Sequence, residues 1–177
     1  MVANSLGDPT AKRLGRLSLN PIPHIDIFGS IILPILSLFG AGLLIGYAKP
    51  VPYDPRNLSD KKFGPLKVAL AGPVSNIILA LLFGLVLRFL PDIFTSALVP
   101  EMFKLIISIN LWLAIFNLFP IPPLDGHWIL RAIFPRANWD GFSGYSIVLI
   151  FFLIFIIAPY IYPLVGWLYE IITGLPA

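Results

Sequence analysis

Long apolar stretches separated by short polar segments dominate the chain. Four windows contain no charged residue: Ile27–Ala48, Val68–Leu87, Leu105–Leu124 and Gly141–Tyr169. Each has about 20 residues or more, which at a rise of ~1.5 Å per residue covers the roughly 30 Å hydrocarbon core of a bilayer. Because backbone polar groups inside lipid must be satisfied within the segment, each window predicts a membrane-spanning helix.

Charges and prolines set the expected helix ends. We expect spans at about residues 27–48, 68–90, 103–119 and 143–169. Three prolines between residues 120 and 123 end the third helix near Asn117–Phe119, because proline lacks the N–H donor and restricts the residue before it. A short new helix is expected from about Leu124 through Arg131.

The pattern therefore predicts an all-α, polytopic membrane protein with about four transmembrane helices. Residues 1–26 form a polar N-terminal segment, and residues 27–172 form the membrane domain. The connection Lys49–Lys67, between the first and second spans, is polar and rich in proline. Its start predicts an extended arm, because each residue before a proline is excluded from the helical region. Its Lys and Arg residues weakly favour a cytoplasmic position.

Composition supports a lipid environment. Hydrophobic residues make up 58% of the 177 positions and charged residues 12%, against roughly 45–50% and about 25% in soluble domains. This composition argues against a water-soluble globule, and the lipid bilayer is an expected partner. The net charge of +3 is spread over short connections, which argues against nucleic acid as a partner. With no cysteine in the chain, any metal site needs His, Asp or Glu.

Polar residues within or beside the apolar windows are the candidates for function, because such groups are costly near lipid. They are His24, Asp26, Asn76, Asn110, Asn117, Asp125 and His127. Asp125 stands out because it lies near the first turn of the expected short helix, where a carboxylate is either a helix-terminal residue or a ligand. His24 and Asp26 are better explained as a local hydrogen-bonded pair than as metal ligands, because their spacing gives little support for a metal site.

For Asn76 and Asn117, the structural interpretation has at least as much weight as the functional one. Asn76 lies in the sequence LAGPVSN, where the small residues around Gly72 offer a face for close helix packing. Asn117 lies one turn before the break, where its side chain can cap freed carbonyls or orient a neighbouring group.

Four motifs in order, LGRLSLNPIPHID, YAKPVPYDPRN, LAGPVSN and NLFPIPPLDG, resemble the site-2 protease family of intramembrane zinc metalloproteases. The likeness is to the compact branch without a PDZ domain. It implies that Asp125 is the third zinc ligand, and that Gly72, Pro73, Asn76 and Asn117, together with His24 and Asp26, line or support the site. It also implies a substrate-binding arm that holds an unwound substrate as an added strand. The arm consists of Lys49, Pro50, Val51, Pro52 and Tyr53.

The chain departs from the family pattern in one motif. In the family, HExxH on one helix supplies two zinc ligands and the general base, and this motif is absent from the 177 residues. Neither His24 nor His127 has a second histidine four positions away. We therefore expect residues 1–26 to follow a missing HExxH helix. The chain as written is then an N-terminally truncated, inactive form with no catalytic residues of its own and no stoichiometric zinc.

The function implied by the resemblance is zinc-dependent hydrolysis of peptide bonds within transmembrane protein substrates, in a multi-pass protein of the cell membrane. The enzyme would be a metalloendopeptidase in its complete form. Two alternatives remain at this point: a non-enzymatic relative that binds membrane proteins, and a small transporter subunit. Transport predicts paired charges within the membrane or inverted repeats, and the sequence shows neither.

Overall fold

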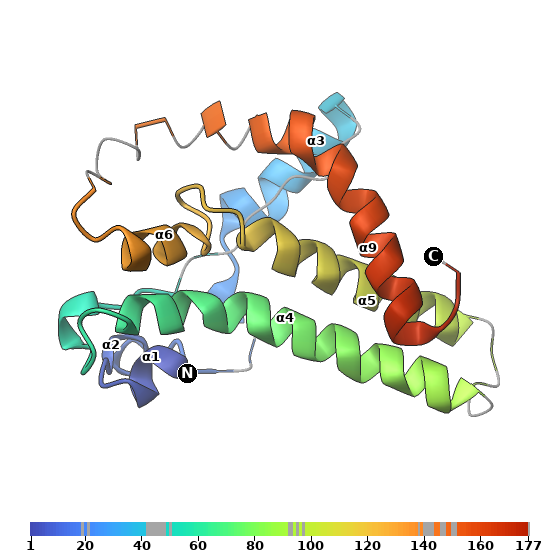
Figure 1. Cartoon of the computed structure of the whole chain (residues 1–177), viewed down its shortest axis with the longest axis horizontal. Coiled ribbons are helices and arrows are strands. Elements are labelled where there is room, and N and C mark those ends of the chain that lie inside the picture. The colour runs from blue at the N-terminus through green and yellow to red at the C-terminus, as the bar shows by residue number, and fades with distance from the viewer. Residues whose placement is uncertain are drawn as a thin grey trace. The chain divides into compact units, whose positions relative to one another are not determined.

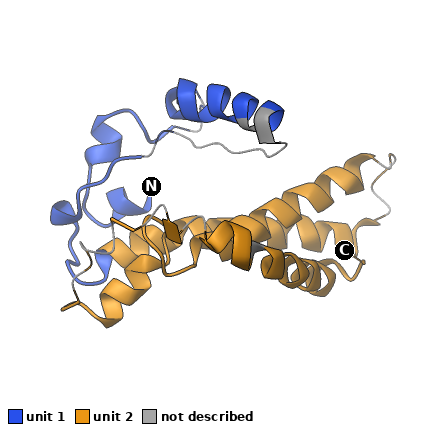
Figure 2. Cartoon of the chain, turned by 90° about the horizontal axis from the view of Figure 1, so that it is seen from above, with its two compact units in different colours: residues 1–64 blue, residues 65–177 orange. Residues whose placement is uncertain are grey.

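The computed structural model is helical and divides into two compact units, Met1–Gly64 and Pro65–Ala177 (Figure 2). It describes residues 1–18, 20, 22–41, 49, 51–91, 94, 96, 98–137, 139, 144–145, 148–149 and 152–176. No β-strand occurs among these residues. The expectation of a helical protein is therefore confirmed for the part of the chain that the structure describes.

The first unit is built from short helical segments. They are α1 (Val2–Ser5), α2 (Thr10–Arg13), the 3₁₀ turns η1 (Ile22–His24) and η3 (Pro55–Asn57), and the π-helical η2 (Phe28–Ile32), which continues into α3 (Leu33–Ala41) (Figure 1). Gly7 and Gly15, with φ of 106° and 67°, follow α1 and α2. Such positive φ values end helices and favour glycine. The rest of the first apolar window, residues 42–48, lies outside the described residues.

The remaining helices follow, and they fall within or extend into the second unit. They are α4 (Gly64–Phe89), α5 (Leu98–Asn117), α6 (His127–Ile133), the π-helical η5 (Leu153–Ile157) and α9 (Ala158–Thr173). α4 and α5 begin several residues earlier than the spans expected from sequence. Pro65 and Pro100 lie in their first turns, where the backbone N–H has no partner within the helix, so proline is tolerated there.

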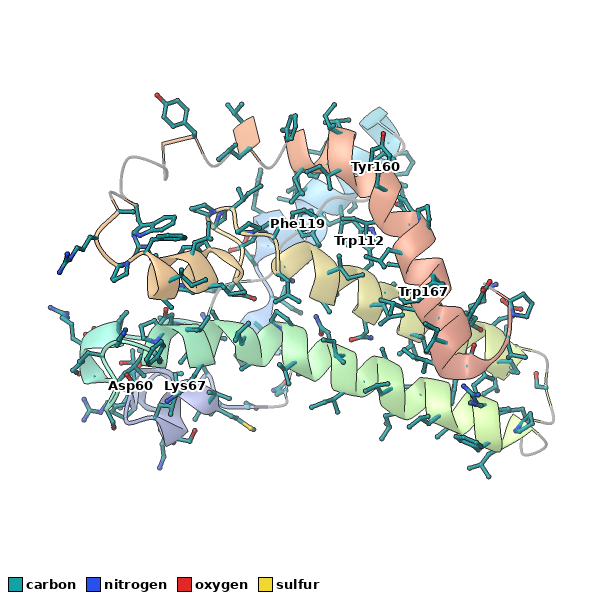
Figure 3. The ribbon with its side chains drawn as sticks, viewed as in Figure 1. Asp60, Lys67, Trp112, Phe119, Tyr160 and Trp167 are labelled. Carbon is teal, nitrogen blue, oxygen red and sulfur yellow. The ribbon has the colours of Figure 1, made fainter. Side chains whose placement is uncertain are left out.

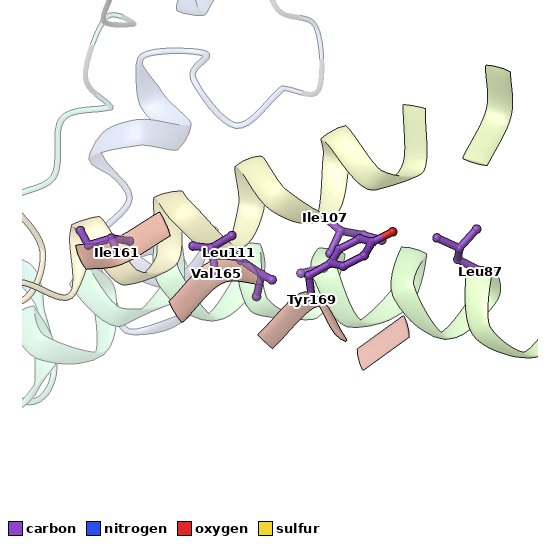
Figure 4. Packing of buried hydrophobic residues seen from close by; sticks show 7 residues of the cluster. Leu87, Ile107, Leu111, Ile161, Val165 and Tyr169 are labelled. Carbon is purple, nitrogen blue, oxygen red and sulfur yellow. The ribbon is translucent and has the colours of Figure 1, made fainter. Parts of the chain in front are cut away.

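A hydrophobic cluster joins α4, α5 and α9. Figure 4 shows Ile161, Val165 and Tyr169 of α9 near Ile107 and Leu111 of α5. Both Ile107 and the α4 residue Ala80 are completely buried. The aromatic rings of Phe83 and Phe103 add an edge-to-face contact between α4 and α5, with centroids 4.9 Å apart. This packing fixes the relative positions of the helices that carry the candidate site.

The end of α4 also makes a close contact with the end of α9. A Cβ added at Gly84 would lie 2.3 Å from Cγ2 of Ile172, so a glycine allows the two helices to approach. Arg88 Nη1 donates a hydrogen bond of 2.7 Å to the carbonyl of Ile171 in the last turn of α9. A cation at this position also stabilises the partial negative charge of the helix C-terminus.

Much of the remaining apolar surface is exposed, as lipid contact requires. Figure 3 labels Tyr160 and Trp167 on α9, whose side chains are 77% and 58% exposed. Among the described residues, α4 and α5 are long and apolar enough to cross a membrane. The expectation of four spans remains a prediction, because the first and fourth windows are only partly described.

Candidate functional site

The turn between α5 and α6 folds back on the end of α5. The backbone N–H of Gly126 donates a hydrogen bond of 2.7 Å to the carbonyl of Asn117, the last residue of α5. A Cβ at Gly126 would lie 2.1 Å from the carbonyl oxygen of Leu118. A side chain is therefore excluded at this position by close packing against backbone, and the glycine of the LDG motif has a steric explanation.

Asp125 lies in this turn and faces α4. Its side chain is half-buried, and its Oδ2 atom lies 3.2 Å from the position that a Cβ on Gly72 would occupy. Gly72 is followed by Pro73, which is buried. The fold thus brings the LDG and GPxxN motifs together, although about 50 residues separate them in sequence. The absence of a side chain at Gly72 leaves room beside the carboxylate.

Two effects act in opposite directions on the Asp125 carboxyl, which lies outside α4 and α5. Burial raises the pKa of the Asp125 carboxyl, and the nearby His127 lowers it to a smaller extent. Within the described part of the chain, no group donates a hydrogen bond to this carboxylate. His127 itself uses Nδ1 to contact the carbonyl of Leu124 at 2.6 Å. The carboxylate oxygens therefore remain available to a cation or a donor from elsewhere.

The two asparagines lie on the helices that flank Asp125. Asn117 Nδ2 donates a hydrogen bond of 2.9 Å to the carbonyl of Leu113, one turn earlier in α5. Asn76 is half-buried on α4, one turn after Gly72. Asn117 thus supports the end of α5 through its side chain and the LDG turn through its carbonyl oxygen.

His24 and Asp26 lie in the first unit and make local contacts. His24 Nε2 is 3.2 Å from the carbonyl of Ser18. Asp26 Oδ1 accepts a hydrogen bond of 2.8 Å from the backbone N–H of Gly29, at the start of η2. Each side chain therefore has its own backbone partner, and the two do not form the hydrogen-bonded pair expected from the sequence.

The residues that the structure describes do not by themselves form a complete zinc site. Among the described residues, no three side chains of His, Cys, Asp or Glu come together as a metal-binding group. A catalytic zinc site uses three protein ligands and one open position. Asp125 fits as one oxygen ligand, but the donor set is incomplete, so no reaction step follows from these residues alone.

The proline-rich arm is held at both ends by hydrogen bonds within the first unit. The backbone N–H of Lys49 donates to the carbonyl of His24 at 3.0 Å. The N–H of Asp54 donates to Asp8 Oδ2 at 2.8 Å. Between these points Val51 and Pro52 are exposed, and Tyr53 is half-buried. Pro50 lies outside the described residues, and the extended conformation of the whole arm remains a prediction.

Asp8 is a buried residue that the sequence analysis did not single out. Its side chain is completely buried and accepts hydrogen bonds from the backbone N–H and hydroxyl of Thr10, Asn57 Nδ2 and the backbone N–H of Asp54. Burial by itself raises the pKa of Asp8, but these hydrogen bonds outweigh it and lower the pKa to about 2. The sequence Gly-Asp-Pro-Thr is itself typical of a turn in which the Asp side chain accepts a hydrogen bond from the backbone two residues later.

Comparison with known proteins gives matches to one enzyme family. The model of peptidase family M50 matches residues 92–158, which include α5 and the Asp125 turn. YwhC of Bacillus subtilis is 38% identical over 168 residues, covering 89% of this chain and 72% of that protein. Rip2 of Mycolicibacterium smegmatis is 28% identical over 177 residues, covering 93% of this chain and 64% of that protein.

An archaeal protein matches over a shorter region. MJ0611 of Methanocaldococcus jannaschii is 44% identical over 66 residues, covering 37% of this chain and 32% of that protein. The names of these three relatives assign them provisionally to the zinc metalloproteases. No solved structure matches the chain.

Proposed function

Because this chain belongs to peptidase family M50, the membrane-embedded site-2 protease family of zinc metalloproteases, we propose that it forms part of an intramembrane protease. The observation that carries the proposal is the position of Asp125. The fold holds its half-buried carboxylate against Gly72, with oxygens that accept no hydrogen bond from the described residues. A half-buried carboxylate with such oxygens is the arrangement expected of a metal ligand.

In this proposal Asp125 is one of three protein ligands of a catalytic zinc ion. The two histidines and the glutamate of HExxH are not among the 177 residues, so they come from sequence outside them. Gly72, Pro73, Asn76 and Asn117 then line or support the site. When bound, the zinc would supply Lewis-acid activation of water for peptide hydrolysis. This chain would contribute a ligand and the surface around it.

The substrates proposed are transmembrane proteins, cleaved within the bilayer of the cell membrane by a multi-pass enzyme. Two helices of suitable length and apolar character support the membrane location. The exposed segment at Val51 and Pro52 supports a role in binding an extended peptide, because an unwound substrate needs a backbone partner. Unwinding is required because a peptide bond within an intact helix is shielded from attack.

The test begins with the gene. Translation of the DNA upstream of Met1 in the same frame should encode an apolar helix with HExxH, and the chain joined to that sequence is called the extended protein below. A stop codon directly upstream would contradict the proposal and favour a relative without protease activity.

Cleavage by the extended protein then tests the role of Asp125. The purified protein in vesicles should cleave a transmembrane model substrate, and Asp125→Asn should abolish cleavage because it removes an anionic ligand while keeping side-chain shape. Asp60→Asn is the matched control, since Asp60 caps backbone N–H groups at residues 62 and 63 in the other unit. Unchanged cleavage by Asp125→Asn would overturn the assignment.

A further inference from the structure

The segment that joins α1 and α2 is connected to the residues that follow the arm. The carbonyl of Leu6 accepts hydrogen bonds from the backbone N–H and hydroxyl of Ser59, at 2.9 and 3.0 Å. Gly7 approaches the same serine so closely that a Cβ there would lie 2.9 Å from the Ser59 hydroxyl oxygen. The segment around Asp8 is thus packed directly against residues 54–59.

Asp8 makes the most specific part of this connection. Its two carboxylate oxygens accept hydrogen bonds from different donors. Oδ1 accepts from Thr10 and from Asn57 Nδ2, whereas Oδ2 accepts from the backbone N–H of Asp54. Asp54 directly follows Tyr53, the last residue of the arm. Because Asp8 is completely buried, water does not compete for these hydrogen bonds.

The other end of the arm has an independent attachment. Lys49 donates its backbone N–H to the carbonyl of His24. Between the two attachments, the side chain of Val51 is 46% exposed, and its backbone makes no hydrogen bond with another described residue. Because the segment is attached at both ends, pairing with an extended chain at the exposed Val51 would cost little conformational freedom.

We propose that Asp8 is a positioning residue that fixes the C-terminal end of the substrate-binding arm through its hydrogen bond to the N–H of Asp54. This inference rests on the proposed function, because it assumes that the arm binds an extended peptide. The Gly-Asp-Pro-Thr segment would then position the arm, which is a different role from binding zinc or contacting the substrate.

Asp8→Asn tests the connection in the 177-residue chain in detergent micelles. An asparagine keeps one acceptor oxygen, but its NH₂ group replaces the oxygen that accepts from Asp54, which places donor against donor. We expect hydrogen exchange of the Asp54 amide to accelerate about tenfold. Asp60→Asn is the control: the asparagine keeps an acceptor oxygen for the N–H groups of Lys62 and Phe63, and exchange at Asp54 should stay unchanged. Unchanged exchange at Asp54 in Asp8→Asn would overturn the proposal.

A binding measurement then separates positioning from stability. With a photoreactive residue at Val51, the 177-residue chain should crosslink to an apolar peptide probe in micelles, and Asp8→Asn should lower the yield several-fold while helix content stays constant. Equal yields from both proteins would overturn the positioning role. Absence of crosslinking in the unmutated protein would overturn the binding function of the arm, while the exchange result would still report on the connection itself.

Kinetics of the extended protein give the third readout. A positioning defect should raise KM several-fold and leave kcat nearly unchanged, because Asp8 does not touch the reacting atoms. A loss of folded protein would instead lower the apparent kcat at constant KM. A change confined to kcat would therefore contradict the positioning role of Asp8.

Discussion

At the scale of single residues, Gly126 illustrates how backbone packing determines residue identity. Its φ of −61° is an ordinary helical value, so the need for glycine comes from contact and not from conformation. Gly126→Ala would bring a Cβ to 2.1 Å from the Leu118 carbonyl oxygen, which cannot move without displacing α5. We expect a loss of about 3 kcal/mol in the free energy of unfolding, at the upper end of the range for overpacking.

Thermal unfolding in detergent measures this loss, with Gly72→Ala as the comparison. An added Cβ at Gly72 meets only the tip of the Asp125 side chain at 3.2 Å, which can shift by a few tenths of an ångström. The Tm of Gly72→Ala should therefore fall much less than that of Gly126→Ala. Equal Tm values for the two variants would contradict the steric explanation.

Asp8 gives a prediction for the pH dependence of the first unit. Its pKa is lowered from 3.8 to about 2 in the folded protein, so the unfolded state binds the proton more readily. The stabilisation from this carboxylate is therefore complete above about pH 4, and it is lost as the pH falls towards 2. Protection of the Asp54 amide from hydrogen exchange, corrected for the intrinsic rate, should decline over this window.

In Asp8→Asn that decline should be absent, because the variant has no proton to bind at this position. Asp60→Asn should keep it. A decline of equal size in Asp8→Asn would show that another carboxylate controls the first unit.

At the scale of secondary-structure elements, Arg88 connects α4 to the end of α9. Arg88→Met removes the hydrogen bond to the Ile171 carbonyl and the favourable charge near the helix C-terminus, but it keeps most of the apolar stem. We expect the free energy of unfolding to fall by about 1 kcal/mol. Urea unfolding followed by tryptophan fluorescence would measure it. Arg136→Met, at an exposed position after α6, should have little effect.

The helices were predictable from sequence to different extents. The apolar windows locate α4 and α5, and the prolines after Phe119 agree with the end of α5 at Asn117. The expected spans begin several residues after the starts of α4 and α5, because the charge-free windows begin only after Lys67 and Lys104, whereas both helices include these lysines. The short α6 begins at His127, three residues after the expected start, because residues 118–126 form the turn that carries Asp125.

In the candidate site, the residues of sequence motifs were predictable, whereas contacts between residues far apart in the chain were not. Motif order identified Asp125 and Gly72, and the fold places them side by side. The role of Asp8 was not predictable, because its hydrogen bonds to Asp54 and Asn57 join residues 46 and 49 positions apart. Sequence patterns report periodicity and turns, whereas such a contact depends on the folded chain.

At the scale of the whole molecule, the charge-free windows predict the topology. If the first window crosses the membrane completely, the Lys49–Lys67 loop and the segment around Arg136 lie on the same, cytoplasmic face. The chain contains no cysteine, so Lys61→Cys and Arg136→Cys can be labelled individually with a membrane-impermeant maleimide. Labelling of both positions from the cytoplasmic side is expected, and labelling from opposite sides would contradict the four-span prediction.

The central claim is that Asp125 is one ligand of a zinc site that residues outside this chain complete. Metal analysis of three purified proteins tests it most directly. The extended protein should contain about one zinc per molecule, because it has three protein ligands. The extended protein with Asp125→Asn and the 177-residue chain should both contain well under one. A full equivalent of zinc in extended Asp125→Asn, or in the 177-residue chain, would contradict the account.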